Sequence, residues 1–189
     1  MPTPHRRTAD ESRAILVNAC IDLLLEHPID EVTNRRLEAA TGINRSYVTR
    51  LFGSRDELLL AAAKELERRL DSLLGDDPAT VDLLAFTARP EARIQTRLAL
   101  QLLSRGVAGS DLLDGPGSLT EGIAQRIEVI LGASPRASRA LALHMQMTAG
   151  FIALFREHMD LDDDALQDVL TVARMQLLHS GPIIEQLGW

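Results

Sequence analysis

The chain is poor in the residues that build disulfide-rich proteins and β-sheets. Its 189 residues include a single cysteine, Cys20, so no disulfide can form within the chain, and a reducing compartment is weakly favoured. Aromatic residues make up only 3% of the chain, and no run of alternating β-branched residues occurs. The N-terminal residues lack the apolar core of a signal peptide, and no apolar run is long enough to cross a bilayer. We therefore expect an all-α protein of the cytoplasm.

The residue patterns of catalysis and metal binding are also missing. No pair of histidines or cysteines has the spacing of a metal site, and no glycine-rich phosphate loop or Gly-x-Ser-x-Gly motif occurs. The aspartates at 162–164 are better explained as the acidic start of a helix than as a cation site. We therefore predict no metal, no cofactor and no enzymatic activity.

Positive charge is concentrated at the front of an acidic chain. The formal net charge is −7, yet residues 1–55 hold eight basic and seven acidic residues, while the rest of the chain holds 12 and 20. Within this front part, residues 33–55 contain five arginines and one acid, Glu38. A local excess of this kind suits a polyanion, which the rest of the chain should repel.

Residues 33–55 have the pattern of two short helices joined by a tight turn and followed at once by a third helix. Thr33 can cap the first helix, and Gly42 can end it in the left-handed conformation. Asn44 can cap the second helix, which we expect to run through Phe52. A Ser-x-x-Glu spacing then starts the third helix. The segment is therefore a candidate helix-turn-helix.

On a helical wheel, the second of these helices has an apolar footing and a polar outer face. Val48, Leu51 and Phe52 fall on the inward side, whereas Ser46 and Arg50 point directly away. The flanks carry Arg45, Tyr47 and Thr49. Arginine can donate twice to guanine, and hydroxyls can contact bases or phosphates, so this face suits the major groove. A solvated, arginine-rich hairpin is the alternative.

The same residues carry a likeness to a known family. The segments ILVNACIDLLLEH and VTNRRLEAATGINRSYVTRLFGSRDELL, within residues 13–60, resemble the DNA-binding region of the TetR family of bacterial one-component regulators. The positions at the family's usual spacing are Leu37, Gly42, Ile43, Val48, Phe52, Ser54 and Leu58. Three positions differ, because the family usually has Ala at Glu38, Tyr at Thr49 and Lys at Arg55. Arg55 keeps the charge of the Lys, whereas the first two differences could alter DNA binding.

The helix pattern and the resemblance together give a set of predicted DNA contacts. It comprises Thr33, Arg35, Asn44, Arg45, Ser46, Tyr47, Thr49, Arg50 and Arg55. We expect Arg50 to bind any sequence, and Arg45 and Tyr47 to discriminate among sequences. Arg55 stands at the start of the third helix, whose free N–H groups could hold a phosphate together with its side chain.

Beyond the motif, apolar periodicity predicts a second, helical domain. We place the DNA-binding domain at 1–55 and a dimerisation and effector-binding domain at 56–189. A long helix from Arg55 to about Gly75 should link the two. Further helices are expected at 79–88, 91–105, 118–132, 135–159 and 163–179, and residues 107–117 are predicted to form a loop.

The helices at 135–159 and 163–179 are apolar on more than one side. Helices of this kind are buried on several faces, so we expect both to pack on their own core and on a second subunit. Pairing them with their symmetry copies would form a four-helix interface in a homodimer. A homodimer would carry two recognition helices and gain affinity for DNA through effective concentration.

Polar side chains on the apolar helices predict a ligand cavity. His144 and Thr148 stand one turn apart beside Phe151, and Arg97 and Gln101 could converge on the same space. The alternative is that these groups are satisfied by neighbours or exposed.

The resemblance implies a repressor that binds a double-stranded DNA operator and is released by a small apolar effector, which would move the long helix. The competing hypothesis is a helical ligand-binding or scaffold protein whose motif no longer binds DNA. Glu38 and Thr49 are its best support.

Overall fold

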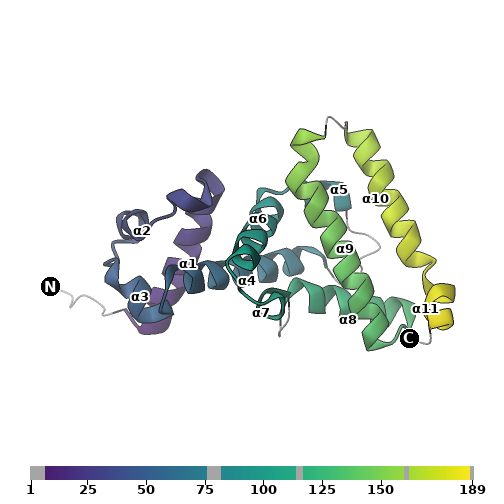
Figure 1. The fold of residues 1–189 in the computed structure, drawn as a ribbon, viewed down its shortest axis with the longest axis horizontal. Coiled ribbons are helices and arrows are strands. Elements are labelled where there is room, and N and C mark those ends of the chain that lie inside the picture. The colour runs from purple at the N-terminus through teal and green to yellow at the C-terminus, as the bar shows by residue number, and fades with distance from the viewer. Residues whose placement is uncertain (1–6, 76–81, 114–116, 160–161, 188–189) are drawn as a thin grey trace. The chain divides into compact units, whose positions relative to one another are not determined.

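The computed structural model describes residues 7–75, 82–113, 117–159 and 162–187 (Figure 1). Every regular element in these ranges is a helix, so the predicted all-α class is confirmed. The chain divides into two compact units, Met1–Glu65 and Leu66–Trp189. The division falls inside the long helix α4 (Arg55–Leu73), later in the chain than residue 55. No helix in the described ranges is long and apolar enough to span a membrane.

The first unit is formed by three helices and the start of α4. These are α1 (Ala9–Glu26), α2 (Asn34–Thr41) and α3 (Ser46–Phe52), with a 3-10 turn, η1 (Ile29–Glu31), between α1 and α2. A capping box starts α1, because the Thr8 hydroxyl accepts from the Glu11 N–H at 3.1 Å and the Glu11 carboxylate accepts from the Thr8 N–H at 2.7 Å.

The core of the first unit is made of aliphatic side chains and one thiol. It comprises Leu16, Cys20, Ile21, Leu24, Val32, Leu37, Val48, Leu58, Leu59 and Ala62. Cys20 is completely buried, and this burial raises the pKa of its thiol to about 12, although the charge of Arg55 opposes the shift. The thiol is therefore neutral and inaccessible, as a small apolar core group would be.

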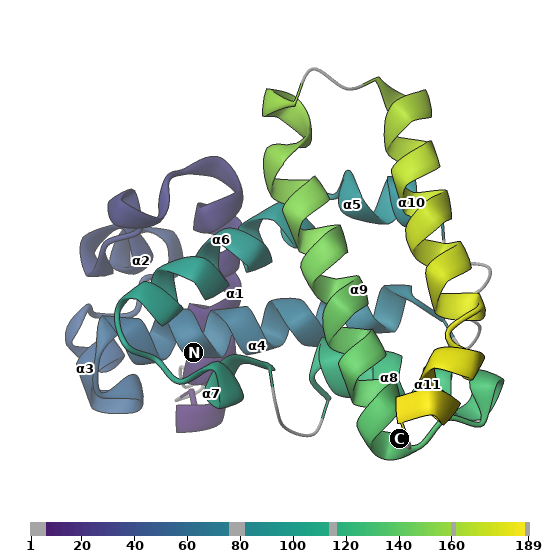
Figure 2. The same cartoon turned by 45° about the vertical axis from the view of Figure 1, so that its right-hand side comes forward.

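In the described part of the second unit, the end of α4 is followed by seven further helices. They are α5 (Leu83–Thr87), α6 (Pro90–Ser104), α7 (Gly109–Leu113), α8 (Leu119–Leu131), α9 (Pro135–Phe155), α10 (Asp163–Leu178) and α11 (Gly181–Leu187). A 3-10 turn, η3 (Arg156–His158), follows α9. Helix α9 packs against α6 and α8, and α5 contacts both α9 and α10 (Figure 2).

Most predicted helices of this unit are present, and two short ones were missed. Ser134 caps α9 by accepting from the Ala137 N–H at 3.3 Å, directly before the proline that starts the helix. The segment predicted as a loop at 107–117 contains α7, so that prediction was wrong for residues 109–113. Helix α11 was not predicted. The first residues of the helix expected at 79–88 lie outside the described ranges.

The core of the second unit joins the end of α4 to α8 and α9. Its buried apolar members are Leu70, Leu74, Phe86, Ala92, Leu119, Ile123, Ala124, Ile127, Ala142 and Ala153. A smaller cluster, Ile152, Leu166 and Leu170, connects α9 to α10. The last two turns of α4 are thereby part of the same core as the helices around them.

Candidate DNA-binding surface and effector cavity

The helix-turn-helix forms through the local contacts that its sequence predicts. The Thr33 hydroxyl accepts from the Arg36 N–H at 3.3 Å, and Gly42 ends α2 with a φ of +67°. Only a residue without Cβ adopts that conformation readily. Asn44 Oδ1 accepts from both the N–H and the hydroxyl of Ser46, at 3.0 and 2.7 Å, and so satisfies the first N–H of α3, although the N-cap position itself is Arg45 and not Asn44 as predicted.

Helix α3 stands on an apolar footing supported by α1. Val48 is 1% exposed, and Leu51 and Phe52 are half-buried, so the inward side is as predicted. Arg13 of α1 lies over the Phe52 ring at 5.0 Å and donates to the backbone carbonyl of Leu51. These contacts fix the orientation of α3 within the first unit, which determines where its outer face points.

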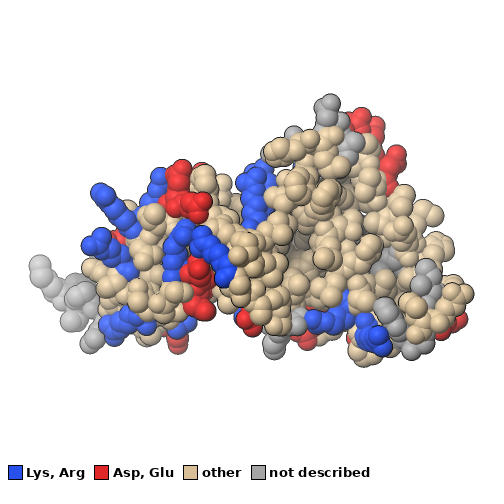
Figure 3. Space-filling view, viewed as in Figure 1, with Lys and Arg blue, Asp and Glu red and all other residues tan. Residues whose placement is uncertain are grey.

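The outer face of α3 is exposed along its length. Its exposed members, with those of the preceding turn, are Asn44, Arg45, Ser46, Tyr47, Thr49 and Arg50. Figure 3 shows basic side chains projecting over α2 and α3 on the visible face. The Arg50 guanidinium lies over the Tyr47 ring at 5.1 Å, which holds a cation and a phenol together on one surface.

Three arginines of the helix-turn-helix are not neutralised by any of the described residues. In the part that the structure describes, Arg35, Arg45 and Arg50 form no ion pair, and all three are exposed. Arg36, by contrast, pairs with Glu31 at 2.8 Å. The motif therefore presents three uncompensated positive charges beside hydroxyl and amide groups, a combination that can bind phosphates and base edges.

Arg55 is placed differently from the phosphate contact that we predicted. Its Nε donates to the Val32 carbonyl at 3.0 Å, and its guanidinium also donates to the Ile29 carbonyl. The side chain is half-buried and holds η1 against the start of α4. Because its donors are used on backbone carbonyls, we assign Arg55 a structural role and leave it out of the DNA-contact set.

A cavity of about 60 Å³ lies inside the second unit. Its apolar lining comes from α4, α5, α6, α8, α9 and α10, and includes Leu70, Leu74, Phe86, Leu119, Ile123 and Leu170. The polar residues on its walls are Gln95, Thr96, Gln146, Thr148 and Arg174. A largely apolar wall with a few polar groups is the usual character of a small-molecule site.

The structure keeps one of the five predicted ligand residues at this cavity. Thr148 lines it, whereas Phe151 lines a separate apolar hollow between α9 and α10. Arg97 and His144 are exposed, and Gln101 is half-buried on α6, so none of these three reaches either space. The five residues therefore do not share one space, and a ligand contact by Thr148 stays a prediction.

A buried carboxylate behind the cavity was missed entirely. Glu67 is 2% exposed, and its Oε1 accepts from Gln95 Nε2 at 2.9 Å and from Gln146 Nε2 at 3.5 Å. Gln146 Oε1 accepts in turn from the Thr120 hydroxyl at 2.5 Å. The signal was present in the sequence, because Glu67 falls on the helical stripe that contains Leu70 and Leu74.

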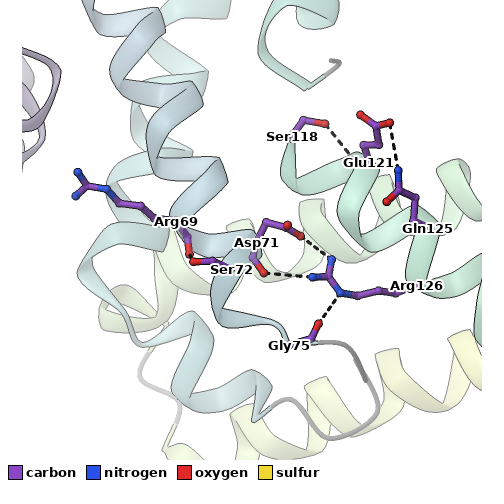
Figure 4. A network of polar contacts seen from close by, with 8 residues as sticks. All are labelled: Arg69, Asp71, Ser72, Gly75, Ser118, Glu121, Gln125 and Arg126. Carbon is purple, nitrogen blue, oxygen red and sulfur yellow. Dashed lines mark hydrogen bonds and ion pairs between the residues drawn. The ribbon is translucent and has the colours of Figure 1, made fainter. Parts of the chain in front are cut away.

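The end of α4 is tied to α8 beside this cavity. Arg126 of α8 donates to Asp71 Oδ1 at 2.6 Å and to the Gly75 carbonyl at 2.6 Å (Figure 4). The last carbonyls of a helix lack intrahelical partners, so the arginine also caps α4. Gly122 faces Asp71, because a Cβ placed there would lie 2.0 Å from Asp71 Oδ1.

Helices α9 and α10 leave apolar side chains uncovered in the single chain. We define the α9–α10 apolar face as Met147, Phe151, Phe155, Met159, Val169, Val172 and Met175, all of which are exposed. Met147 is 74% exposed, and the Phe151 and Phe155 rings stack with centroids 4.7 Å apart.

Among the described residues, no group of three or more potential ligands could hold a metal ion.

Two solved structures share the fold formed by the helix-turn-helix unit and the helical unit that follows it. The chain is similar to the crystal structure of the multidrug binding protein EbrR complexed with imidazole, over 86% of this chain and 94% of that one, with a TM-score of 0.64 and 19% identity. It is also similar to the TetR family repressor AlkX from Dietzia sp. strain DQ12-45-1b, implicated in biodegradation of n-alkanes, over 92% and 95% of the two chains, with a TM-score of 0.55 and 16% identity.

No model of a known protein family matches the sequence, and no curated protein does either. The structural comparisons show that the chain has the fold of a TetR-family repressor, as the resemblance predicted.

Proposed function

We propose that this protein is a transcriptional regulator that binds a double-stranded DNA operator as a homodimer and is controlled by a small, largely apolar effector. The observation that carries the proposal is the exposed face of α3, where Arg45 and Arg50 stand uncompensated on a rigid footing. The fold shared with a TetR family repressor supports it. Repression relieved by the effector is the mode of action that we propose.

DNA binding would use the motif as a positioned, positively charged helix. Arg35 and Arg50 would contact phosphates, while Arg45 and Tyr47 would read base edges in the major groove. Thr33, Asn44, Ser46 and Thr49 would supply further hydrogen bonds. Each phosphate neutralised releases counterions, so affinity should fall steeply as salt rises.

The homodimer would form through the α9–α10 apolar face. Seven exposed apolar side chains on adjacent helices need a partner surface, and a second copy offers the same face by two-fold symmetry. Replacing Phe151 or Met147 with Asp should give a monomer in sedimentation analysis, because a charge would be buried in the interface. Val129→Asp on α8 is the matched control, since Val129 is 85% exposed and outside this face. Wild-type protein that sediments as a monomer would contradict the dimer.

The effector would act through α4. Leu70 of this helix and Leu74, the residue after its end, line the cavity, and the same helix begins at the helix-turn-helix. A ligand in the cavity would therefore contact the helix that carries the DNA-binding unit. The ligand can change operator affinity only if it binds the DNA-bound and the DNA-free forms of the protein with different affinity.

The decisive experiment is selection of DNA fragments by the purified chain, followed by a salt titration on the fragments retained. We expect retention that weakens steeply with salt and is lost in Arg45→Ala/Arg50→Ala. Arg97→Gln, an exposed arginine of α6, should bind like the wild type. Failure to enrich any fragment at low salt would instead favour the scaffold hypothesis.

A further inference from the structure

One charged group lines the effector cavity among the residues that the structure describes. It is Arg174 of α10, which is half-buried and has no hydrogen-bond or ion-pair partner in the described part of the chain. A guanidinium stays protonated at any pH at which the protein is folded. A partly desolvated cation on a mainly apolar wall is stabilised when an anion joins it.

The position of the other polar groups locates that anion within the cavity. Gln95 and Gln146 each donate an amide N–H to the buried Glu67 carboxyl group, so these two donors are already used. An anion on the glutamine wall would have to compete with Glu67 for them. Thr148 also lines the cavity, and its hydroxyl has no partner in the described part of the chain. The Thr96 hydroxyl already donates to the Ala92 carbonyl at 3.0 Å. Arg174 and Thr148 are therefore the side-chain donors left for an anion.

The size and the apolar lining of the cavity limit the rest of the ligand. A cavity needs roughly 10–15 Å³ of volume to hold a single water molecule. The cavity of about 60 Å³ therefore has room for only a few such groups, without movement of its walls. Leu70, Leu119 and Ile123 would surround an apolar body. A short aliphatic or aromatic tail fits these walls, and a second charged end does not.

We propose that the effector is a small amphipathic carboxylate, with its carboxylate on Arg174 and Thr148 and its apolar body against Leu70 of α4 and the adjoining Leu74. This inference deepens the effector site proposed above and rests on it. The carboxylate engages α10 while the tail contacts α4, so one small molecule touches both the helix of the apolar face and the helix of the DNA-binding unit.

Calorimetric titration of the full-length wild type without DNA tests the ligand class. Hexanoate is the probe, and 1-hexanol and hexylamine are its neutral and cationic counterparts of matched length. We expect hexanoate to bind more tightly than either. Arg174→Gln should weaken hexanoate on the order of 10- to 100-fold and leave hexanol unchanged, because a charge-assisted hydrogen bond is lost. Arg97→Gln should leave both unchanged.

Tighter binding of hexylamine than of hexanoate would overturn the proposal and would place a cation near Glu67 instead. Unchanged hexanoate affinity in Arg174→Gln would overturn it as well. If Arg174→Gln does not fold, Arg174→Lys keeps the charge without the paired donors and should bind hexanoate with intermediate affinity. The order of the three probes on the wild type decides the question independently of any variant.

A second measurement separates this proposal from the proposed function. Hexanoate added to the complex of the protein with a selected DNA fragment should change DNA affinity in the wild type and not in Arg174→Gln. A chain that binds hexanoate through Arg174 but retains no DNA would refute the regulator and keep the ligand assignment. A chain that binds DNA but prefers hexanol or hexylamine would refute the ligand assignment alone.

Discussion

Gly122→Ala tests the contact between α8 and the end of α4. The added Cβ would lie 2.0 Å from Asp71 Oδ1, 2.6 Å from Asp71 Cγ and 2.8 Å from Arg126 Nη1. No real methyl group tolerates such distances, so the Asp71 side chain must rotate away. Rotation breaks its 2.6 Å ion pair with Arg126. The substitution therefore exchanges an ion pair for a methyl group.

Two opposed contributions determine whether Gly122→Ala raises or lowers the free energy of unfolding. A hydrogen bond between charged groups contributes about 1.5–3 kcal/mol when protected from water, and the side chains of Arg126 and Asp71 are 17% and 26% exposed, so about 2 kcal/mol is reasonable. Alanine in a helix is favoured over glycine by about 1 kcal/mol. The net expectation is a loss of about 1 kcal/mol of unfolding free energy.

Removing the carboxylate should reverse this sign. In an Asp71→Ala background the Asp71 contacts are absent and only Arg126 Nη1, the end of a flexible side chain, lies within 3 Å of the added Cβ. Because the freed guanidinium can move, Gly122→Ala should stabilise the protein by about 1 kcal/mol. Urea unfolding of the four proteins of this cycle, at one protein concentration, measures a coupling of about 2 kcal/mol. Gly109→Ala in α7 is the control, because its Cβ would meet only Leu103 at an ordinary 3.9 Å. The same sign for Gly122→Ala in both backgrounds would refute the reasoning.

Three further predictions concern the first unit. Because burial raises the Cys20 pKa from 9.0 to about 12, its contribution to stability is complete below pH 9 and is lost as the pH rises towards 12. The wild type should therefore lose roughly 1 kcal/mol more than Cys20→Ala between pH 7 and pH 10 in urea unfolding, and parallel pH profiles would contradict this. Arg55→Gln should destabilise the protein by about 1–3 kcal/mol, because the Ile29 and Val32 carbonyls lose a charged donor, and intact stability would argue against its structural role. Arg50→Ala should weaken binding to all DNA sequences and reduce the salt slope by roughly one ion, whereas Tyr47→Ala should change the order of preference among sequences. Equal losses on every operator variant would rule out base reading by Tyr47.

The helix-turn-helix was predictable because its determinants are local. The caps of α2 and α3 and the left-handed Gly42 involve partners within four residues, so spacing alone identifies them. The inward Val48 and the exposed Arg45 and Arg50 follow from helical periodicity in the same way.

The role of Arg55 could not be read from spacing. Its acceptors, the carbonyls of Ile29 and Val32, lie more than twenty residues earlier in the chain. A position at the start of a helix is compatible with binding a phosphate or a backbone carbonyl. Only the packing of η1 beside α4 shows which acceptor is present.

The residues that line the cavity also could not be predicted from sequence spacing alone. Periodicity placed Thr148 on an apolar helix, but Gln95, Gln146 and Arg174 come together with it only because α6, α9 and α10 pack around one space. His144 has the same sequence signal as Thr148, but its side chain is exposed. The two residues are four positions apart, which is slightly more than one helical turn, so their side chains do not point in the same direction.

By itself the sequence determined the all-α class, the helix-turn-helix and the uncompensated charge of its outer face. These features depend on residues a few positions apart, whose geometry the helix imposes. The tertiary structure alone decided that Arg55 supports η1, that Glu67 is buried behind two glutamines, and that Arg174 faces a cavity. Those outcomes depend on contacts between segments that are distant in the sequence. The local pattern is compatible with several arrangements of these side chains, and the free energy of packing the segments together determines which one forms.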